Sequence, residues 1–183
     1  MSSPDKHDPA GDLSILAVRN PSDLERFIRV PWSIYGDDPC WIPPLLMERK
    51  EHLSAKNPYF RHASWQAWVA FCNGKPVGRI SAQVDQLRLQ RYHDATGLFG
   101  FIEADDDPAT FQLLLDTACD WLREQGMKRV QGPFNLSIND ECGLLVEGFD
   151  TPPSFMMGHA RPYYAARIEA LGFNKAKDLL AYR

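Results

Sequence analysis

Hydrophobic and polar positions alternate along this chain with two different periods, one typical of strands and one typical of helices. Trp65 to Cys72 is almost entirely apolar, Asn73-Gly74 is a favoured two-residue hairpin turn, and Gly78 to Asp85 alternates between apolar and polar residues. These segments predict a β-hairpin. Three other segments have strand character, namely Leu13 to Val18, Gly97 to Ala104 and Arg129 to Phe134.

Apolar residues at helical spacing predict helices between these strands. The first helix begins at a cap formed by Ser22 and is kinked or ended by Pro31. A second runs from Leu45 to about Leu53, because the two prolines before it suit a first helical turn. Asp107 caps a third, long helix that ends before Gly126.

The end of the chain carries the most specific pattern. An amphipathic helix from Pro162 is stopped by Gly172, an aromatic residue follows, and Lys175 to Tyr182 is predicted to be a strand. This closing segment, and the order of elements from Leu13 to Arg183, resemble the GNAT (Gcn5-related N-acetyltransferase) superfamily, in a divergent bacterial branch. The resemblance implies an α+β fold, with a mixed, mostly antiparallel central sheet, helices on both faces, and the last strand of the family lacking.

The composition agrees with one globular domain. Leu13 to Arg183 is long enough for a single domain, whereas Met1 to Asp12 is polar and is predicted to be a disordered leader. The formal net charge is −4, with both signs interspersed, which argues against a broad nucleic-acid surface. No apolar stretch reaches the roughly 18 residues that a membrane span needs, and no secretory signal is seen, so we expect a cytoplasmic protein. The four cysteines and five histidines show no metal-ligand spacing, and no metal site is predicted.

The resemblance also implies a co-substrate. In the GNAT family, the strands before and after the long helix splay apart, and the pantetheine arm of acyl-CoA lies in the gap. Gly97 to Ala104 and Arg129 to Phe134 correspond to those strands, so acyl-CoA or acetyl-CoA is expected between them. The candidate contacts to this co-substrate are Phe101, Ile102, Asn135 and Ser137.

One part of the family pattern is missing. GNAT enzymes usually bind the CoA pyrophosphate with a glycine-containing loop, whose backbone N–H groups point at the phosphates. The corresponding junction here, Ala104 to Pro108, holds three aspartates and neither glycine nor arginine. Aspartates satisfy the helix dipole and repel an incoming pyrophosphate. A phosphate loop of the usual kind is therefore not predicted.

Two residues are candidates for catalytic groups. Glu103 lies on an apolar strand face, where desolvation would raise its pKa and suit it to deprotonate an ammonium as general base. Alternatively, it lies in solvent or pairs with Arg79 or Arg129. Ile168 stands where the family has the tyrosine that protonates the leaving thiolate, and Tyr164 lies one helical turn earlier on roughly the same face. Tyr164 is therefore the candidate acid, with a packing role as the alternative.

An aromatic loop is the candidate site for the acceptor. It carries Trp32, Tyr35 and Trp41, and together with Phe155 to Met157 it could line a pocket for a small-molecule amine or a lipid-like acceptor. The alternative is that these large apolar side chains belong to the core.

The segment from Gly132 to Gly143 contains the densest set of polar groups. Asn139 and Asp140 are candidates for substrate contacts, because function tends to lie on such loops. The alternative is a connector whose side chains bond its own backbone. Cys142 would need a base such as His159 and a lowered pKa to act as a nucleophile.

These inferences lead to two hypotheses. The first is an N-acyltransferase that moves an acyl group from acyl-CoA, or another acyl thioester, to an amine. The second is a catalytically degenerate GNAT-like module that serves binding or assembly. The family closes with two strands, and only Lys175 to Tyr182 is available here. The missing strand could come from the second half of a longer chain, of which this is the N-terminal half, or from another copy in a homodimer.

Overall fold

The sheet is a single layer whose strands follow one another in chain order. Residues 12–180 are described by a computed structural model. Its described residues form one sheet of five strands: β1 (Leu13–Ala17), β2 (Ala63–Cys72), β3 (Lys75–Asp85), β4 (Thr96–Ala104) and β5 (Arg129–Gln131). Strands β1 to β4 are antiparallel neighbours, and β5 runs parallel to β4. The mixed, mostly antiparallel sheet predicted from the sequence is confirmed.

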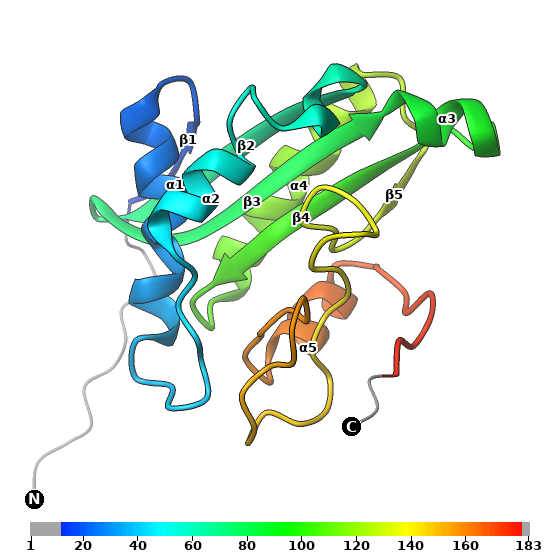
Figure 1. The fold of residues 1–183 in the computed structure, drawn as a ribbon. Coiled ribbons are helices and arrows are strands. Elements are labelled where there is room, and N and C mark those ends of the chain that lie inside the picture. Colours follow the sequence, from blue (N-terminus) through cyan, green and yellow to red (C-terminus); the bar gives the residue numbers. More distant parts are fainter. Residues whose placement is uncertain (1–11, 181–183) are drawn as a thin grey trace, which may run out of the picture.

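Helices cover both faces of this sheet (Figure 1). Along the chain they are α1 (Pro21–Tyr35), α2 (Leu46–His52), α3 (Gln86–Tyr92), α4 (Pro108–Glu124) and α5 (Tyr164–Ala170), with a short 3₁₀ helix, η1 (Pro58–Arg61). Helices α1 and α4 both pack on β3, from opposite faces, while α2 lies against α1 and α5 against α4. Within the described part of the chain, no helix is long and apolar enough to cross a membrane.

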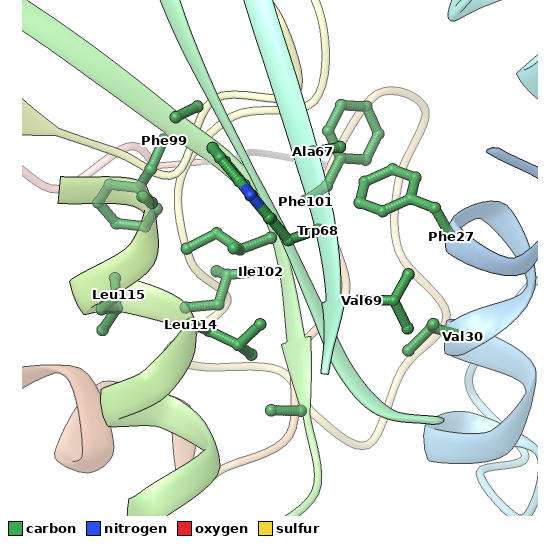
Figure 2. Close-up of a cluster of buried hydrophobic side chains, with 14 of the residues drawn as sticks. Phe27, Val30, Ala67, Trp68, Val69, Phe99, Phe101, Ile102, Leu114 and Leu115 are labelled. Carbon is green, nitrogen blue, oxygen red and sulfur yellow. The ribbon is translucent and has the colours of Figure 1, made fainter. Parts of the chain in front are cut away.

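The core consists of two layers of apolar side chains, one on each face of the sheet. Figure 2 shows Phe27 of α1 on one side of the strands and Leu114 and Leu115 of α4 on the other. All three side chains are at most 2% exposed, and the Phe27 ring meets Phe101 of β4 at a centroid distance of 5.7 Å. Burial of apolar area on both faces explains why β4 reads as a continuous apolar run.

The local structure of the first helix differs from the prediction in two respects. Asn20, rather than Ser22, caps α1, because its side chain accepts from the N–H groups of Ser22 and Asp23. Of the two effects expected of Pro31, a kink or an end of the helix, the end is wrong: α1 continues to Tyr35, and Ile34 and Tyr35 are buried in the core. The predicted hairpin is confirmed, with Cys72 opposite Lys75 across the turn.

Two strands predicted after the long helix α4 are wrong in part. The strand expected over Arg129 to Phe134 stops at Gln131, because Gly132 and then Pro133, which has no N–H group to donate, follow it. The strand expected over Lys175 to Tyr182 is not formed over residues 175–180, which are exposed to solvent, and residues 181–183 lie outside the described part. Helix α3, which the sequence analysis missed, is capped by the Asp85 side chain.

The predicted leader lies almost entirely outside the described residues. Its last residue, Asp12, is described and exchanges two hydrogen bonds with Asn73 of the hairpin turn, at 3.1 and 3.2 Å. The disorder expected for the leader stays a prediction.

The segment that follows β5 packs directly against β4. Phe134 N–H donates to the Phe99 carbonyl at 2.7 Å. A β-carbon at Gly100 would lie 1.7 Å from the Phe134 carbonyl oxygen, so only glycine fits there. This close approach fixes where the chain leaves the sheet.

Gly100→Ala should therefore destabilise the protein, by about 3 kcal/mol, because the added methyl group overlaps a backbone atom that cannot move freely. Gly158→Ala is the matched control, since the nearest atom to its β-carbon is the Gly143 oxygen at 3.6 Å. Its expected change is within about 0.5 kcal/mol. Urea unfolding measures both, and equal stabilities of the two variants would contradict this packing.

Candidate functional site

Strand β4 pairs with β3 on one edge from Leu98 to Ala104, apart from one irregularity, but on the other edge it has a neighbouring strand only at its start. Strand β5 pairs with Thr96 to Leu98 alone. Beyond that point, the Phe134 N–H and three side chains supply hydrogen-bond partners for the backbone of β4. Asn135 Oδ1 accepts from Phe101 N–H at 2.7 Å, the Tyr164 hydroxyl accepts from Ala104 N–H at 3.0 Å, and the Tyr163 hydroxyl donates to the Ala104 carbonyl at 2.8 Å. The edge thus has hydrogen-bond partners without a neighbouring strand.

An irregularity in β4 lies beside these contacts. The β3–β4 register shifts between Arg79 and Ser81, and Phe101 has a φ of 48°. After the shift, Glu103 stands opposite Arg79, and their Oε2 and Nε atoms are 2.5 Å apart. Arg79 also donates to the Phe27 carbonyl at 2.9 Å and lies over the Phe27 and Phe101 rings. The structure thus contains the pairing of Glu103 with Arg79, which is one of the alternatives left open by the sequence.

A second, partly buried ion pair lies close to the first. Arg49 Nη2 is 2.8 Å from Glu141 Oε1, and Asn135 Nδ2 donates to the other oxygen of Glu141 at 2.9 Å. Burial alone would raise the pKa of Glu141, but the Arg49 charge and these hydrogen bonds outweigh it and lower that pKa. The carboxylate is therefore held in its charged form.

Two cavities open beside these pairs. The larger has a volume of about 510 Å³ and lies between α1, α2 and the segment from Pro153 to His159. The smaller, of about 40 Å³, lies where β4 and the chain after β5 separate. Glu103, Glu141 and His159 line both cavities. We call these three residues the junction.

The predicted acceptor residues are divided between the cavity wall and other places. Tyr35, Trp41 and Asp140 line the larger cavity, as do Phe155 to Met157. Trp32 lies beside Trp41, with the two rings edge-to-face at 5.3 Å, and is not among the lining residues.

The residues predicted to contact the substrate or co-substrate from β4 and from the loop after β5 are likewise divided between a cavity wall and other places. Asn139 is exposed and lines neither cavity. Asn135 and Ile102 line the smaller cavity. Phe101 is buried and lines neither cavity. Ser137 also lines neither cavity, and its hydroxyl donates to Asp140 at 2.6 Å.

Tyr164 lies in the core rather than on a cavity wall. Its side chain is fully buried, and its hydroxyl accepts from Ala104 N–H and from the Tyr35 hydroxyl, the latter at 2.9 Å. Tyr35 in turn lines the larger cavity. Burial raises the pKa values of Tyr35 and Tyr164 well above the ordinary tyrosine value, and the charge of Glu103 adds to the effect.

Several groups at the site were not found by the sequence analysis. No motif in the sequence indicates a role for Asp38, Arg49 or Glu141. Asp38 meets His159 and Arg49 meets Glu141 only in the fold, because the partners lie far apart in the chain. His159 was considered only as a base for Cys142. Burial and the nearby Asp140 raise the pKa of the Cys142 thiol, which disfavours a thiolate nucleophile there.

The N-terminus of α4 is already occupied by its own side chains. Asp107 accepts from Thr110 N–H at 2.9 Å and from the Thr110 hydroxyl at 2.7 Å, and it also accepts from Ala109 N–H. Asp106 pairs with Arg167 at 2.8 Å. The predicted cap is confirmed, and a pyrophosphate does not fit here, since the N–H groups are taken and the surrounding carboxylates would repel it.

Among residues 12–180, no group of three His, Cys, Asp or Glu side chains is arranged to hold a metal ion.

Comparisons with known proteins found relatives in bacteria. The chain is 57% identical to the protein YghO of Escherichia coli (strain K12) over 163 residues, which cover 89% of this chain and 42% of YghO. It is 51% identical to a protein named bacterial ceramide synthase from Caulobacter vibrioides over 174 residues, which cover 94% of this chain and 45% of the relative. The chain thus spans less than half the length of these relatives. No protein-family model matches it.

Solved structures with the same arrangement are acetyltransferases. An aminoglycoside N-acetyltransferase in complex with CoA aligns with a TM-score of 0.55 at 12% identity, covering 96% of this chain and 97% of the enzyme. The same enzyme with a bisubstrate analogue aligns with a TM-score of 0.53 at 14% identity, covering 93% and 97%. At these identities the likeness shows the fold, and it is the fold predicted from the sequence.

The electrostatics at the start of α4 give a testable consequence. Burial and the neighbouring Asp107 raise the pKa of Asp105. The folded state therefore binds this proton more tightly than the unfolded chain does, and the charged carboxylate costs stability as the pH rises through that pKa.

Asp105→Asn should raise the free energy of unfolding near neutral pH, by at most about 0.5 kcal/mol because the side chain is largely exposed. The gain should disappear below the ordinary aspartate pKa of 3.8, because there Asp105 of the parent is protonated and, like the asparagine of the variant, uncharged. Urea unfolding at the two pH values measures it. A gain that is the same at both would contradict the assignment.

Proposed function

From the premise that this chain has the GNAT fold, we propose that it is an N-acyltransferase, which moves an acyl group from an acyl thioester such as acyl-CoA to an amine. The observation that carries the proposal is the junction, where Glu103, Glu141 and His159 border both cavities. An amine in the larger cavity and a thioester entering through the smaller one would meet there, within reach of groups that can bind or move protons.

The chemistry of the larger cavity favours a cationic acceptor with an apolar tail. Its lining contains four carboxylates and two guanidinium groups, a formal charge of −2 with the histidines neutral: Glu48, Glu103, Asp140, Glu141, Arg49 and Arg79. The same lining also contains large apolar side chains, among them Trp41, Ile42 and Phe155. A long-chain amine presents an ammonium at one end and hydrocarbon at the other, and so complements both parts.

The name of one relative agrees with this class of acceptor. The protein from Caulobacter vibrioides is named a ceramide synthase, and a ceramide is the amide of a fatty acid with a long-chain amino alcohol. We therefore propose a long-chain amine, rather than an aminoglycoside, as the acceptor of this chain.

The reaction requires two protons to leave the acceptor. An ammonium loses one proton to become nucleophilic, its nitrogen forms the bond to the acyl carbon, and the carbon–sulfur bond breaks with its electron pair on sulfur. The nitrogen then loses a second proton as the amide forms, and the thiolate gains one. In the proposal, Glu103 binds the ammonium and passes its first proton to water, because the carboxylate borders the cavity that holds the amine.

Tyr164, the candidate acid, would act on the thiolate only through Tyr35, which separates it from the cavity. The raised pKa of both hydroxyls makes them reluctant donors. We propose that this pair positions Ala104 at the end of β4 and closes the wall of the larger cavity.

The donor is proposed to enter with its thioester beside Ile102 at the smaller cavity. Because the N-terminus of α4 is blocked by Asp107 and Asp106, the phosphates of a CoA donor are proposed to lie away from that helix end.

One observation favours the alternative of a non-catalytic module. The β4 edge along which a pantetheine arm would lie already has partners in Asn135, Tyr163 and Tyr164. A protein that serves only binding or assembly would keep this edge closed.

Mass spectrometry of reaction mixtures separates the two proposals. The folded chain should form an N-acyl product when sphinganine is combined with acetyl-CoA or palmitoyl-CoA, together with an equal amount of free thiol. Ethanolamine, which has no apolar tail, serves as the control acceptor and should react poorly. No amide with any donor, from protein shown to be folded, would favour the non-catalytic module.

Phe155→Ser tests the apolar wall. Phe155 is 91% exposed, so the change should leave the fold intact but raise KM for sphinganine about fivefold, corresponding to about 1 kcal/mol of lost apolar contact. Leu87→Ser, at an exposed position on α3 away from both cavities, is the matched control and should leave KM unchanged. The same KM for Phe155→Ser and the parent would contradict the placement of the tail.

A further inference from the structure

His159 is the member of the junction with an unused polar atom. Its side chain is 6% exposed, and its Nε2 lies 3.0 Å from Asp38 Oδ2. Its Nδ1 is buried and, within residues 12–180, has no hydrogen-bond partner. Buried polar atoms in proteins usually have a partner, so an unpartnered ring nitrogen on a residue that borders two cavities points to a group that binds there.

Asp38 determines which ring nitrogen is left free. Burial opposes its charge, but the hydrogen bonds from His159 and from Cys40 N–H, with the Arg161 guanidinium at 3.4 Å, lower its pKa. The carboxylate is therefore charged and accepts the proton of Nε2–H. In that tautomer Nδ1 carries a lone pair and can accept a proton.

The surroundings fix the ring in this orientation. Tyr35 packs edge-on against it at a centroid distance of 5.1 Å. Arg161, two residues further on, ties the segment to the end of α1 by donating to the Ile34 carbonyl at 2.7 Å and by pairing with Asp37. The His159 ring is therefore held by contacts on several sides.

The other two junction residues are engaged. Arg79 binds Glu103, and Arg49 and Asn135 bind Glu141. The tyrosine pair is a poor source of protons, as argued above. The leaving thiolate would thus lack a ready donor unless His159 supplies one.

We propose that His159 carries the second proton of the acyl transfer from the attacking nitrogen to the departing sulfur, and that Asp38 positions its ring. This inference rests on the proposed N-acyltransferase function. As the carbon–nitrogen bond forms, Nδ1 takes a proton from nitrogen. As the carbon–sulfur bond breaks with its electron pair on sulfur, Nδ1–H returns that proton to the thiolate, so the ring ends as it began. His159 borders both cavities, and the proposal requires its Nδ1 to face the place where they meet.

His159→Gln tests the proposal because a glutamine amide can still donate to Asp38 but cannot accept and release a proton. With palmitoyl-CoA and sphinganine, we expect kcat to fall by about 10²- to 10⁴-fold, the usual contribution of general acid–base catalysis, while KM for sphinganine and the unfolding midpoint stay close to those of the parent. Asp38→Asn should also lower kcat without raising KM.

His62→Gln is the matched control. His62 forms another histidine–aspartate contact of 3.0 Å, with Asp85, and lines neither cavity. Its kcat should equal that of the parent. An unchanged kcat for His159→Gln, in a protein that forms amide, would overturn the role of His159 and leave the proposed function standing.

A spectroscopic measurement tests the ring without turnover. Long-range ¹H–¹⁵N NMR spectra of the wild-type chain should show His159 with a protonated Nε2 and an unprotonated Nδ1, and Asp38→Asn should weaken this preference. A proton on Nδ1, or equal populations of the two tautomers, would overturn the inference even if His159→Gln did not fold. A wild-type chain that has the expected tautomer but forms no amide would count against the proposed function instead.

Discussion

The architecture of the site depends on an unpaired edge of a β-strand. Strand β4 loses its neighbour after Leu98, and buried backbone groups that lack partners are costly. Asn135 from the loop after β5, and Tyr163 and Tyr164 from the start of α5, provide those partners. Meeting this requirement draws two distant segments to the end of β4. The same segments carry Glu141 and His159, so the need for backbone hydrogen bonds also assembles the junction.

Charge is organised around that edge in a consistent way. Each carboxylate of the junction is bound to an arginine from a different element: Glu103 to Arg79 of β3, and Glu141 to Arg49 of α2. Removing the carboxylate from either pair would leave a buried arginine without its partner. His159 instead faces an aspartate and keeps one nitrogen free. The site therefore combines carboxylates, which can bind a cation, with a histidine whose free nitrogen can accept and release a proton.

The sequence predicts the fold better than the site. The Asn73-Gly74 turn and the Asp107 cap are local features, and their geometry follows from the residues themselves. The strand expected after Lys175 followed from the resemblance of the closing segment, which does not show whether a partner strand exists. Glu103 was identified because it lies on a regular strand, whereas its pairing depends on the register shift at Phe101. Asp38 and His159 are 121 residues apart, and only the fold brings them together.

The most direct test of the account is a crystal structure of the chain with sphinganine bound. The account predicts that the amine nitrogen lies at the junction, within hydrogen-bond distance, about 3 Å, of Glu103 and His159, with the hydrocarbon chain along Trp41 and Phe155. An amine bound outside the larger cavity, or with its nitrogen at the solvent end and its tail at the junction, would contradict it.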